Sequence, residues 1–123
     1  MDLYSENILE YYKHPPNKGQ FAACNVQASE ANPTCGDKIQ ILLHVEDGKI
    51  IKAQFDGEGC AISQAATSMI LESLEGKSLE EAKNIDNQEV YDLLGIEISP
   101  GRVKCALLGL VATKKAIILH QNA

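Results

Sequence analysis

The sequence lacks the features that mark a membrane, secreted or nucleic-acid-binding protein. No apolar run in its 123 residues approaches the roughly 20 residues that a helix needs to cross a bilayer. The N-terminus, Met1-Asp2-Leu3-Tyr4, lacks the basic and apolar regions of a secretory signal. Only 11 basic residues stand against 17 acidic ones, so the net charge of -6 leaves no basic footprint for nucleic acid or an anionic membrane. We expect a cytoplasmic protein that binds neither.

The chain also lacks internal repeats, low-complexity tracts and linkers. Its length predicts a single domain, residues 1–123, which is large enough to bury a core without disulfides or metal for stability. Four cysteines could pair as two disulfides. A reducing compartment keeps thiols free, however, and spaced cysteines there are more often metal-binding or catalytic. The four are Cys24, Cys35, Cys60 and Cys105.

A β-hairpin is predicted between two of these cysteines. Residues 38–45 alternate apolar and polar side chains, and Ile51, Ala53 and Phe55 continue that alternation after the turn signal Asp47-Gly48. A two-residue loop would set the apolar residues of one strand against polar residues of the other. The pattern therefore favours a three-residue loop, 46–48, with Gly48 left-handed in a bulge.

The predicted register pairs Val45 with Lys49 and Ile39 with Phe55. Continued outward, it places Cys35 near Gly59 and Asp37 near Gly57, and neighbouring strands lie only about 5 Å apart. Because Asp37 lies two residues beyond Cys35, an extended segment points both side chains to the same face. Cys35, Asp37 and Cys60 should then meet at the open end of the hairpin.

The rest of the chain reads mostly as helix. Apolar spacing, capping signals and prolines predict five helical segments: one from Ser5 to Tyr12, one from Cys60 to Gly76, two that open with Ser78 and Asp86, and one opened by Ser99-Pro100. The apolar face of the last one is predicted to be Val103, Ala106, Leu107, Leu110, Val111, Ile117 and Ile118, with Cys105 off that stripe. Residues 25–29 are a candidate edge strand. The predicted fold is α+β, with a small three-stranded antiparallel sheet packed with helices.

Three thiols and a carboxylate form the candidate site. Cys35, Asp37, Cys60 and Cys105 make a ligand set that can hold zinc tetrahedrally or bind an iron-sulfur cluster. Nearby glycines at 36, 57 and 59 would let a bulky inorganic group approach the backbone. Against this, a lone cysteine can be a small buried hydrophobe, and an aspartate in this setting can be a solvated loop residue or a local cap.

The chain resembles the NifU-type scaffolds for iron-sulfur cluster assembly, which include IscU and the zinc-containing SufU. The motifs that carry the resemblance are Leu3-Tyr4-Ser5 through Asn17-Lys18-Gly19, Asn32-Pro33-Thr34-Cys35-Gly36-Asp37, Gly57-Glu58-Gly59-Cys60-Ala61-Ile62-Ser63 and Arg102-Val103-Lys104-Cys105-Ala106. The resemblance implies a SufE/NifU-like fold. It also implies a non-enzymatic carrier that accepts sulfur from a pyridoxal-phosphate cysteine desulfurase, combines it with iron and passes a [2Fe-2S] cluster to apoproteins.

The same resemblance implies individual roles. Cys35, Asp37, Cys60 and Cys105 would hold the cluster, with Asp37 as the fourth ligand or its gate. Cys105 would be the first persulfide acceptor, and the charge of Lys104 would favour its thiolate. An electron donor such as a ferredoxin and a second copy of the chain are further candidate partners.

Departures from the family pattern keep a second function open. Lys104 stands where IscU proteins carry a histidine, and residues 98–104 do not match the chaperone-recruiting segment Leu-Pro-Pro-Val-Lys. Lys104 favours a SufU-like, zinc-dependent sulfurtransferase that takes a persulfide from the desulfurase. The chain is, however, too short for the insertion of SufU proteins. A structural zinc domain is a third interpretation, but glycines make the site open and structural sites are usually closed. Cys24 matches no position of the family motifs.

Overall fold

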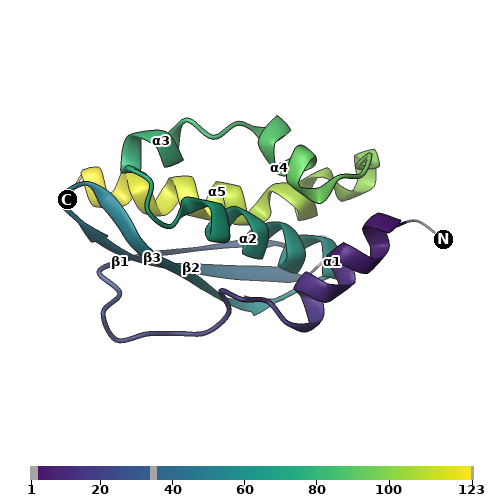
Figure 1. The fold of residues 1–123 in the computed structure, drawn as a ribbon, viewed down its shortest axis with the longest axis horizontal. Helices are drawn as coiled ribbons and strands as arrows, with labels where there is room; N and C mark the ends of the chain where they lie inside the picture. Colours follow the sequence, from purple (N-terminus) through teal and green to yellow (C-terminus); the bar gives the residue numbers. More distant parts are fainter. Residues whose placement is uncertain (1–2, 34–35, 123) are drawn as a thin grey trace.

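The computed structural model describes residues 3–33 and 36–122. Two helices cover one face of a three-stranded antiparallel sheet, and shorter helices lie above them (Figure 1). This arrangement confirms the predicted α+β class. The elements, in chain order, are α1 (Leu3–Lys13), β1 (Val26–Asn32), β2 (Asp37–Glu46), β3 (Lys49–Glu58), α2 (Ala61–Leu74), α3 (Leu79–Lys83), α4 (Asn87–Leu94), the 3-10 turn η1 (Pro100–Arg102) and α5 (Val103–Gln121).

The central strand of the sheet is β2, between β1 and β3. Its alternate residues Ile39, Ile41 and Leu43 are buried under the helices, as the alternation predicts. The edge strand β3 pairs along part of its length with the segment 17–19, through hydrogen bonds of 2.9 Å from the Phe55 amide to the Asn17 carbonyl and 2.8 Å from the Gly19 amide to the Phe55 carbonyl.

The hairpin loop differs from the prediction. Glu46 pairs with Lys49 across a two-residue turn, in which Asp47 and Gly48 have φ angles of 51° and 73°. The register shifts by one residue beyond Val45, which pairs with Ile50 and not with Lys49. Ile51 is the extra residue of this β-bulge.

The bulge explains why the predicted loop is wrong. Ile50 points inward and is fully buried, whereas Ile51 is 49% exposed. Beyond the bulge Ile41 pairs with Phe55 and Ile39 with Gly57, so the apolar sets still match. The extra residue lies in β3 and not in the loop, so the predicted pairing of Ile39 with Phe55 is wrong by two residues, although apolar residues still face apolar residues.

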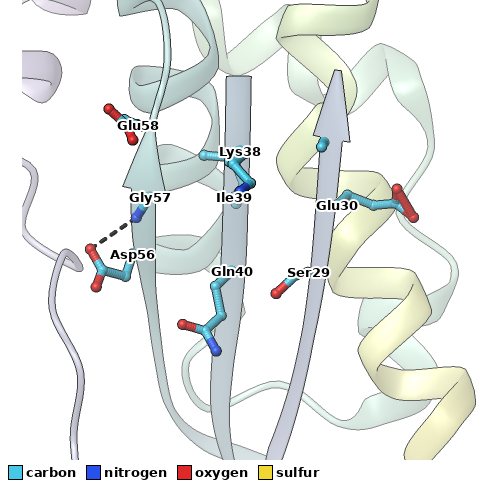
Figure 2. Close-up of a pocket in the computed structure, with 9 residues that line it drawn as sticks. Ser29, Glu30, Lys38, Ile39, Gln40, Asp56, Gly57 and Glu58 are labelled. Carbon is cyan, nitrogen blue, oxygen red and sulfur yellow. Dashed lines mark hydrogen bonds between the residues drawn. The ribbon is translucent and has the colours of Figure 1, made fainter. Parts of the chain in front are cut away.

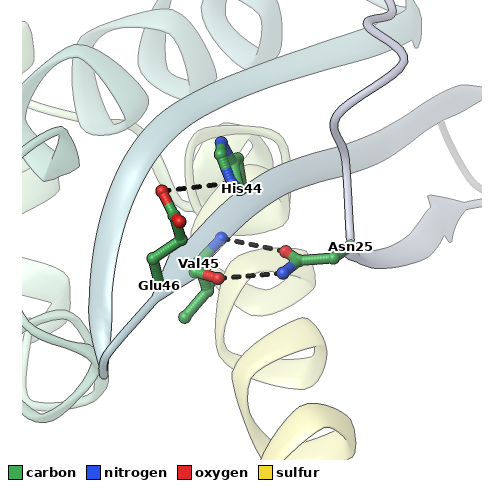
Figure 3. Close-up of polar contacts among 4 residues, drawn as sticks. All are labelled: Asn25, His44, Val45 and Glu46. Atoms are coloured by element: carbon green, nitrogen blue, oxygen red, sulfur yellow. Dashed lines mark hydrogen bonds and ion pairs between the residues drawn. The ribbon is translucent and has the colours of Figure 1, made fainter.

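Strand β1 reaches further toward the site than the predicted segment 25–29. A polar clamp precedes it: the Asn25 side chain accepts a hydrogen bond from the Val45 amide at 2.9 Å and donates one to the Val45 carbonyl at 2.8 Å (Figure 3). The amide thereby mimics a paired strand residue. The same view shows the contact between His44 and Glu46, in which the ring nitrogen Nε2 lies 3.5 Å from a carboxylate oxygen. At its other end β1 extends to Asn32, opposite Asp37.

The packing of α5 differs from the predicted apolar stripe. Val111 and Ile118 are about half exposed, whereas Cys105, predicted off the stripe, is 1% exposed. Small residues explain this rotation: a side chain on Gly109 would collide with Thr67 of α2, so only glycine allows the two helices to lie so close. The buried face of α5 is Cys105, Ala106, Leu108, Gly109, Leu110, Ala112, Thr113, Ala116 and Ile117.

The remaining helix predictions are confirmed. Ser78 and Glu81 form a reciprocal capping box at α3, and the Asp86 carboxylate caps α4 by accepting from the Glu89 amide. Helix α1 packs beside α2, and its Tyr11 hydroxyl donates to the Glu72 carboxylate at 2.6 Å. Within the described residues, no helix combines the length and apolar character needed to span a membrane.

Candidate metal centre

Three of the predicted site residues converge where β2 begins and where α2 and α5 begin. Asp37, Cys60 and Cys105 each offer a ligand atom, and these atoms lie within 4.8 Å of one another. Asp37 and Cys105 are both 1% exposed, and Cys60 is partly buried. Residues as far apart in sequence as Asp37 and Cys105 therefore share one small site. Cys35 lies outside the described residues, so its place in this site stays a prediction.

Strand alternation determines the direction of Asp37. It belongs to the inward-facing set of β2 that includes Ile39 and Ile41, so its carboxylate enters the layer between the sheet and the helices. Its Oδ1 accepts a hydrogen bond from the Cys60 amide at 2.9 Å, and its Oδ2 lies 4.0 Å from the Cys60 sulfur. The register places Asp37 beside Gly59, two residues beyond the predicted Gly57.

The two carboxylate oxygens of Asp37 can therefore do different work. Oδ1 holds the amide at the start of α2, where backbone N–H groups have no partner within the helix and negative charge is favourable. Oδ2 faces the thiol side of the site and is placed to act as a ligand. The local-cap interpretation and the ligand interpretation are compatible, since each uses its own oxygen.

Gly59 makes this approach possible. A Cβ atom at this position would lie 2.5 Å from Asp37 Oδ1 and 2.6 Å from the hydroxyl oxygen of Ser63. Both distances are too short for real contacts, so any larger residue would displace the carboxylate. Ser63 is fully buried and donates to the Cys60 carbonyl at 3.0 Å. Of the predicted glycines, Gly59 borders the described site directly.

Asn32 opens the motif that runs to Asp37, but the sequence pattern predicts no role for it. In the structure its side-chain amide donates a hydrogen bond to the Cys105 sulfur, with 3.9 Å between nitrogen and sulfur. Asn32 is 5% exposed and pairs in register with Asp37. Its position at the end of β1, three residues before Cys35, was the available signal. To interpret this position one must know that β1 pairs with β2, and the sequence alone does not establish that pairing.

Lys104 is exposed beside the buried Cys105. With Val103, Leu107 and Val111 it lines a groove between α5 and the end of β1. No acidic residue follows Glu97, whereas four basic residues do: Arg102, Lys104, Lys114 and Lys115. The end of the chain that contributes Cys105 is thus cationic in a protein of net charge -6. The predicted support of the thiolate by Lys104 stays a prediction.

A second hollow lies on the opposite face of the sheet. Figure 2 shows this groove, which encloses about 670 Å³ and is bordered by polar side chains such as Lys38, Gln40 and Asp56. The three site residues do not line it.

Cys24 is also absent from the candidate centre, and its thiol donates to the Val26 carbonyl at 3.2 Å.

Two thiols and one carboxylate in a largely buried site suit a thiophilic metal. Thiolate ligands select zinc and iron-sulfur centres over hard cations such as magnesium and calcium. The donor set fits a metal centre of that class, and the 4.8 Å limit lets the three atoms share one ion or neighbouring ions.

Known proteins with this architecture carry related names. The family described as "NifU-like N terminal domain" matches residues 3–122. The zinc-dependent sulfurtransferase SufU of Bacillus subtilis (strain 168) is 33% identical over 137 aligned positions, which cover 98% of this chain and 92% of the relative. The iron-sulfur cluster assembly scaffold protein IscU of Escherichia coli (strain K12) is 34% identical over 123 positions, covering 97% and 94%.

Solved structures agree with these relatives. The crystal structure of FiSufU, a candidate iron-sulfur cluster assembly scaffold protein for the SUF system from the thermophile Fervidobacterium islandicum AW-1, superimposes with a TM-score of 0.79. The match is 29% identical and covers 93% of this chain and 96% of that one. Since the family match spans almost the whole sequence and relatives above 30% identity cover at least 97% of it, the chain belongs to the family of the NifU-like N-terminal domain.

Proposed function

We propose that the protein is a scaffold on which a transient [2Fe-2S] cluster is assembled from iron and desulfurase-derived sulfur, and from which it passes to recipient apoproteins. The observation that carries the proposal is the convergence of Asp37, Cys60 and Cys105 within 4.8 Å. With Cys35 this set would supply three thiolates and one carboxylate. The protein would act as a carrier, and the cluster would be its cargo.

The first covalent step would be the arrival of sulfur on Cys105. Its thiolate would attack the outer sulfur of a cysteine persulfide on a pyridoxal-phosphate desulfurase. A new sulfur–sulfur bond would form on Cys105 as the donor's sulfur–sulfur bond breaks, and the donor cysteine would leave as a thiolate. Reducing this sulfane sulfur to sulfide takes two electrons, which a one-electron carrier such as a ferredoxin would supply in two steps.

The basic α5 segment supports this assignment. A [2Fe-2S] cluster with four anionic ligands carries excess negative charge, and Lys104 lies next to the Cys105 ligand. Lys104 would offset part of that charge and favour the thiolate form of Cys105. Asp37 would be the weakest ligand toward the cluster, because a carboxylate is harder than a thiolate. Release of the cargo would therefore begin at Asp37.

A zinc-dependent sulfurtransferase is the second candidate function. The B. subtilis relative carries that name, and Lys104 replaces the histidine that IscU proteins have before the last cysteine. Asp37, Cys60 and Cys105 could hold zinc together with Cys35, one thiol leaving the metal to accept a persulfide. Against this, the alignment with SufU has 137 positions and this chain only 123 residues, so SufU contains residues without a counterpart here.

Metal and sulfide analysis of the native protein separates the two functions. The protein should be purified anaerobically from cells that grow with iron and zinc. Iron with acid-labile sulfide and visible absorption is expected for the scaffold. Colourless protein with one zinc, together with stimulated sulfur release from a desulfurase, would overturn the scaffold proposal in favour of the sulfurtransferase. If metal removal unfolded the domain, the site would instead be structural zinc.

The first sulfur acceptor can be identified directly. The protein is incubated briefly with a cysteine desulfurase and cysteine, and the peptides are analysed by mass spectrometry. We expect an additional 32 Da, the mass of one sulfur atom, on the peptide that contains Cys105. Cys24→Ser serves as the matched control, because its thiol lies outside the described centre. Sulfur that appears first on Cys35 would contradict the assignment and favour the SufU-like mechanism.

A further inference from the structure

We propose that Asn32 is a positioning residue for the Cys105 sulfur. Its amide N–H would keep that sulfur aimed at the centre and reduce the electron density that it donates to a bound metal. This inference rests on the proposed function only in taking Cys105 as a ligand. It adds a residue outside the predicted ligand set.

The contact is made in a buried setting. The Asn32 nitrogen lies 3.9 Å from the Cys105 sulfur, and the two residues are 5% and 1% exposed. The long distance fits sulfur, whose radius exceeds that of oxygen. Water has little access to either group, so it competes weakly with the N–H···S interaction.

The main chain of Asn32 is fixed from two directions. Its carbonyl accepts a hydrogen bond from the Gly36 amide at 2.9 Å. On the sheet side Asn32 pairs with Asp37 across β1 and β2. The residue thus contacts the segments that bear two of the predicted ligands, Asp37 and Cys105. A side chain anchored in this way can hold a ligand atom in one orientation.

Groups that hydrogen-bond to metal ligands determine how those ligands bind. Outer partners of this kind orient the ligand, and their loss typically lowers metal affinity about 10- to 100-fold. Hydrogen bonds to sulfur also set the reduction potential of iron-sulfur centres. Without the Asn32 N–H, the Cys105 sulfur would donate more electron density. Thiolate-to-metal charge-transfer absorption should then move to longer wavelength, and the reduction potential of a bound cluster should become more negative.

Asn25 provides the matched control. It is also an asparagine whose amide is fully used, because it donates to the Val45 carbonyl and accepts from the Val45 amide (Figure 3). It precedes β1, whereas Asn32 ends it. Leucine has nearly the shape of asparagine but no N–H donor. Asn25→Leu should lower stability, since it removes two hydrogen bonds to the backbone at a site that is more exposed than Asn32.

The experiment uses cobalt(II) as the probe on the full metal-free chain under anaerobic conditions. In Asn32→Leu we expect about a 10-fold or greater loss of cobalt affinity and a charge-transfer band displaced to longer wavelength. Asn25→Leu should show the affinity and band of the parent protein, despite a lower unfolding temperature. If Asn32→Leu fails to fold, Asn32→Ala is measured by the same criteria.

An unshifted band and parental affinity in the folded Asn32 variant would overturn the inference. Equal shifts in the Asn25 variant would also overturn it, because they would trace to general destabilisation. Cobalt binding requires neither sulfur nor a partner protein. Iron and sulfide analysis of the parent chain therefore tests the proposed function separately, and either proposal can fail while the other survives.

Discussion

Replacing Asp37 by alanine tests both roles of its carboxylate. The change removes the acceptor of the Cys60 amide at the start of α2, a contact of 2.9 Å made by a side chain that is 1% exposed. Hydrogen bonds to a charged partner contribute about 1.5 to 3 kcal/mol, so we expect Asp37→Ala to lower the free energy of unfolding by that amount. For a chain of this length, 1 kcal/mol corresponds to roughly 4 °C, so the midpoint should fall by roughly 6 to 12 °C.

The amide variant separates the cap from the ligand. Asp37→Asn keeps a carbonyl oxygen that can accept the Cys60 N–H, so its metal-free form should stay within about 1 kcal/mol of the parent. Both variants lose the anionic ligand and should hold an assembled cluster longer and transfer it more slowly, as the gating role requires. Asp86→Ala is the control: it removes the cap of α4, costs about 1 kcal/mol and should leave transfer unchanged.

Two measurements decide the outcome. Thermal or urea unfolding of the metal-free variants gives the stability loss, and anaerobic transfer to an apo-ferredoxin gives the release rate. An Asp37→Ala protein as stable as the parent would show that the Cys60 contact contributes nothing. Variants that lose their cluster as fast as the parent, or faster, would refute the gating role whatever the stability result.

Other changes probe the site and its surroundings. Serine at any one of the three predicted thiol ligands should abolish stable cluster or tight metal binding in absorption and metal assays, whereas Cys24→Ser should bind like the parent; the three are Cys35, Cys60 and Cys105. Gly59→Ala should cost about 1 to 3 kcal/mol in urea unfolding and weaken metal binding, because the added Cβ would displace the Asp37 carboxylate. The hydrogen bond to Glu72, reinforced by burial, raises the pKa of Tyr11, so its stabilising contribution is complete below pH 10 and is lost as pH rises through the raised value. Tyr11→Phe should therefore be less stable than the parent at pH 8 and equal to it once the parent's tyrosine ionises, and a constant difference up to high pH would contradict this.

Local signals predicted most of the fold. Alternation along β2, the capping box at Ser78 and the cap at Asp86 depend on neighbours a few residues apart, so the sequence alone specifies them. The bulge at Ile51 does not follow from alternation, since an extra residue in the loop and an extra residue in β3 both set apolar residues opposite one another, in registers that differ by two residues. Alternation therefore indicates that the hairpin needs an extra residue but not which strand contains it.

Packing between distant elements escaped prediction. Most sides of α5 carry apolar residues of its own, so the periodicity of the sequence could not identify which side is buried. Which side is buried depends on the close contact between Gly109 and Thr67 of α2, a helix that α3 and α4 separate from α5 along the chain. The rotation it imposes buries Cys105 and brings its sulfur to Asn32. The sequence thus identified the candidate ligands by type and motif, while the partner of Cys105 required the assembled sheet.

The contacts of Lys115 bear on how the protein avoids self-association. Edge strands offer backbone groups to which another chain can add a strand, a common route to aggregation. At the β1 edge the Lys115 ammonium donates to the Ser29 carbonyl at 3.0 Å and lies 3.3 Å from the Glu30 carboxylate. An incoming strand would have to displace that charge and leave it desolvated. The opposite edge is partly occupied by residues 17–19, so both edges of the sheet are partly protected against the addition of an unrelated strand.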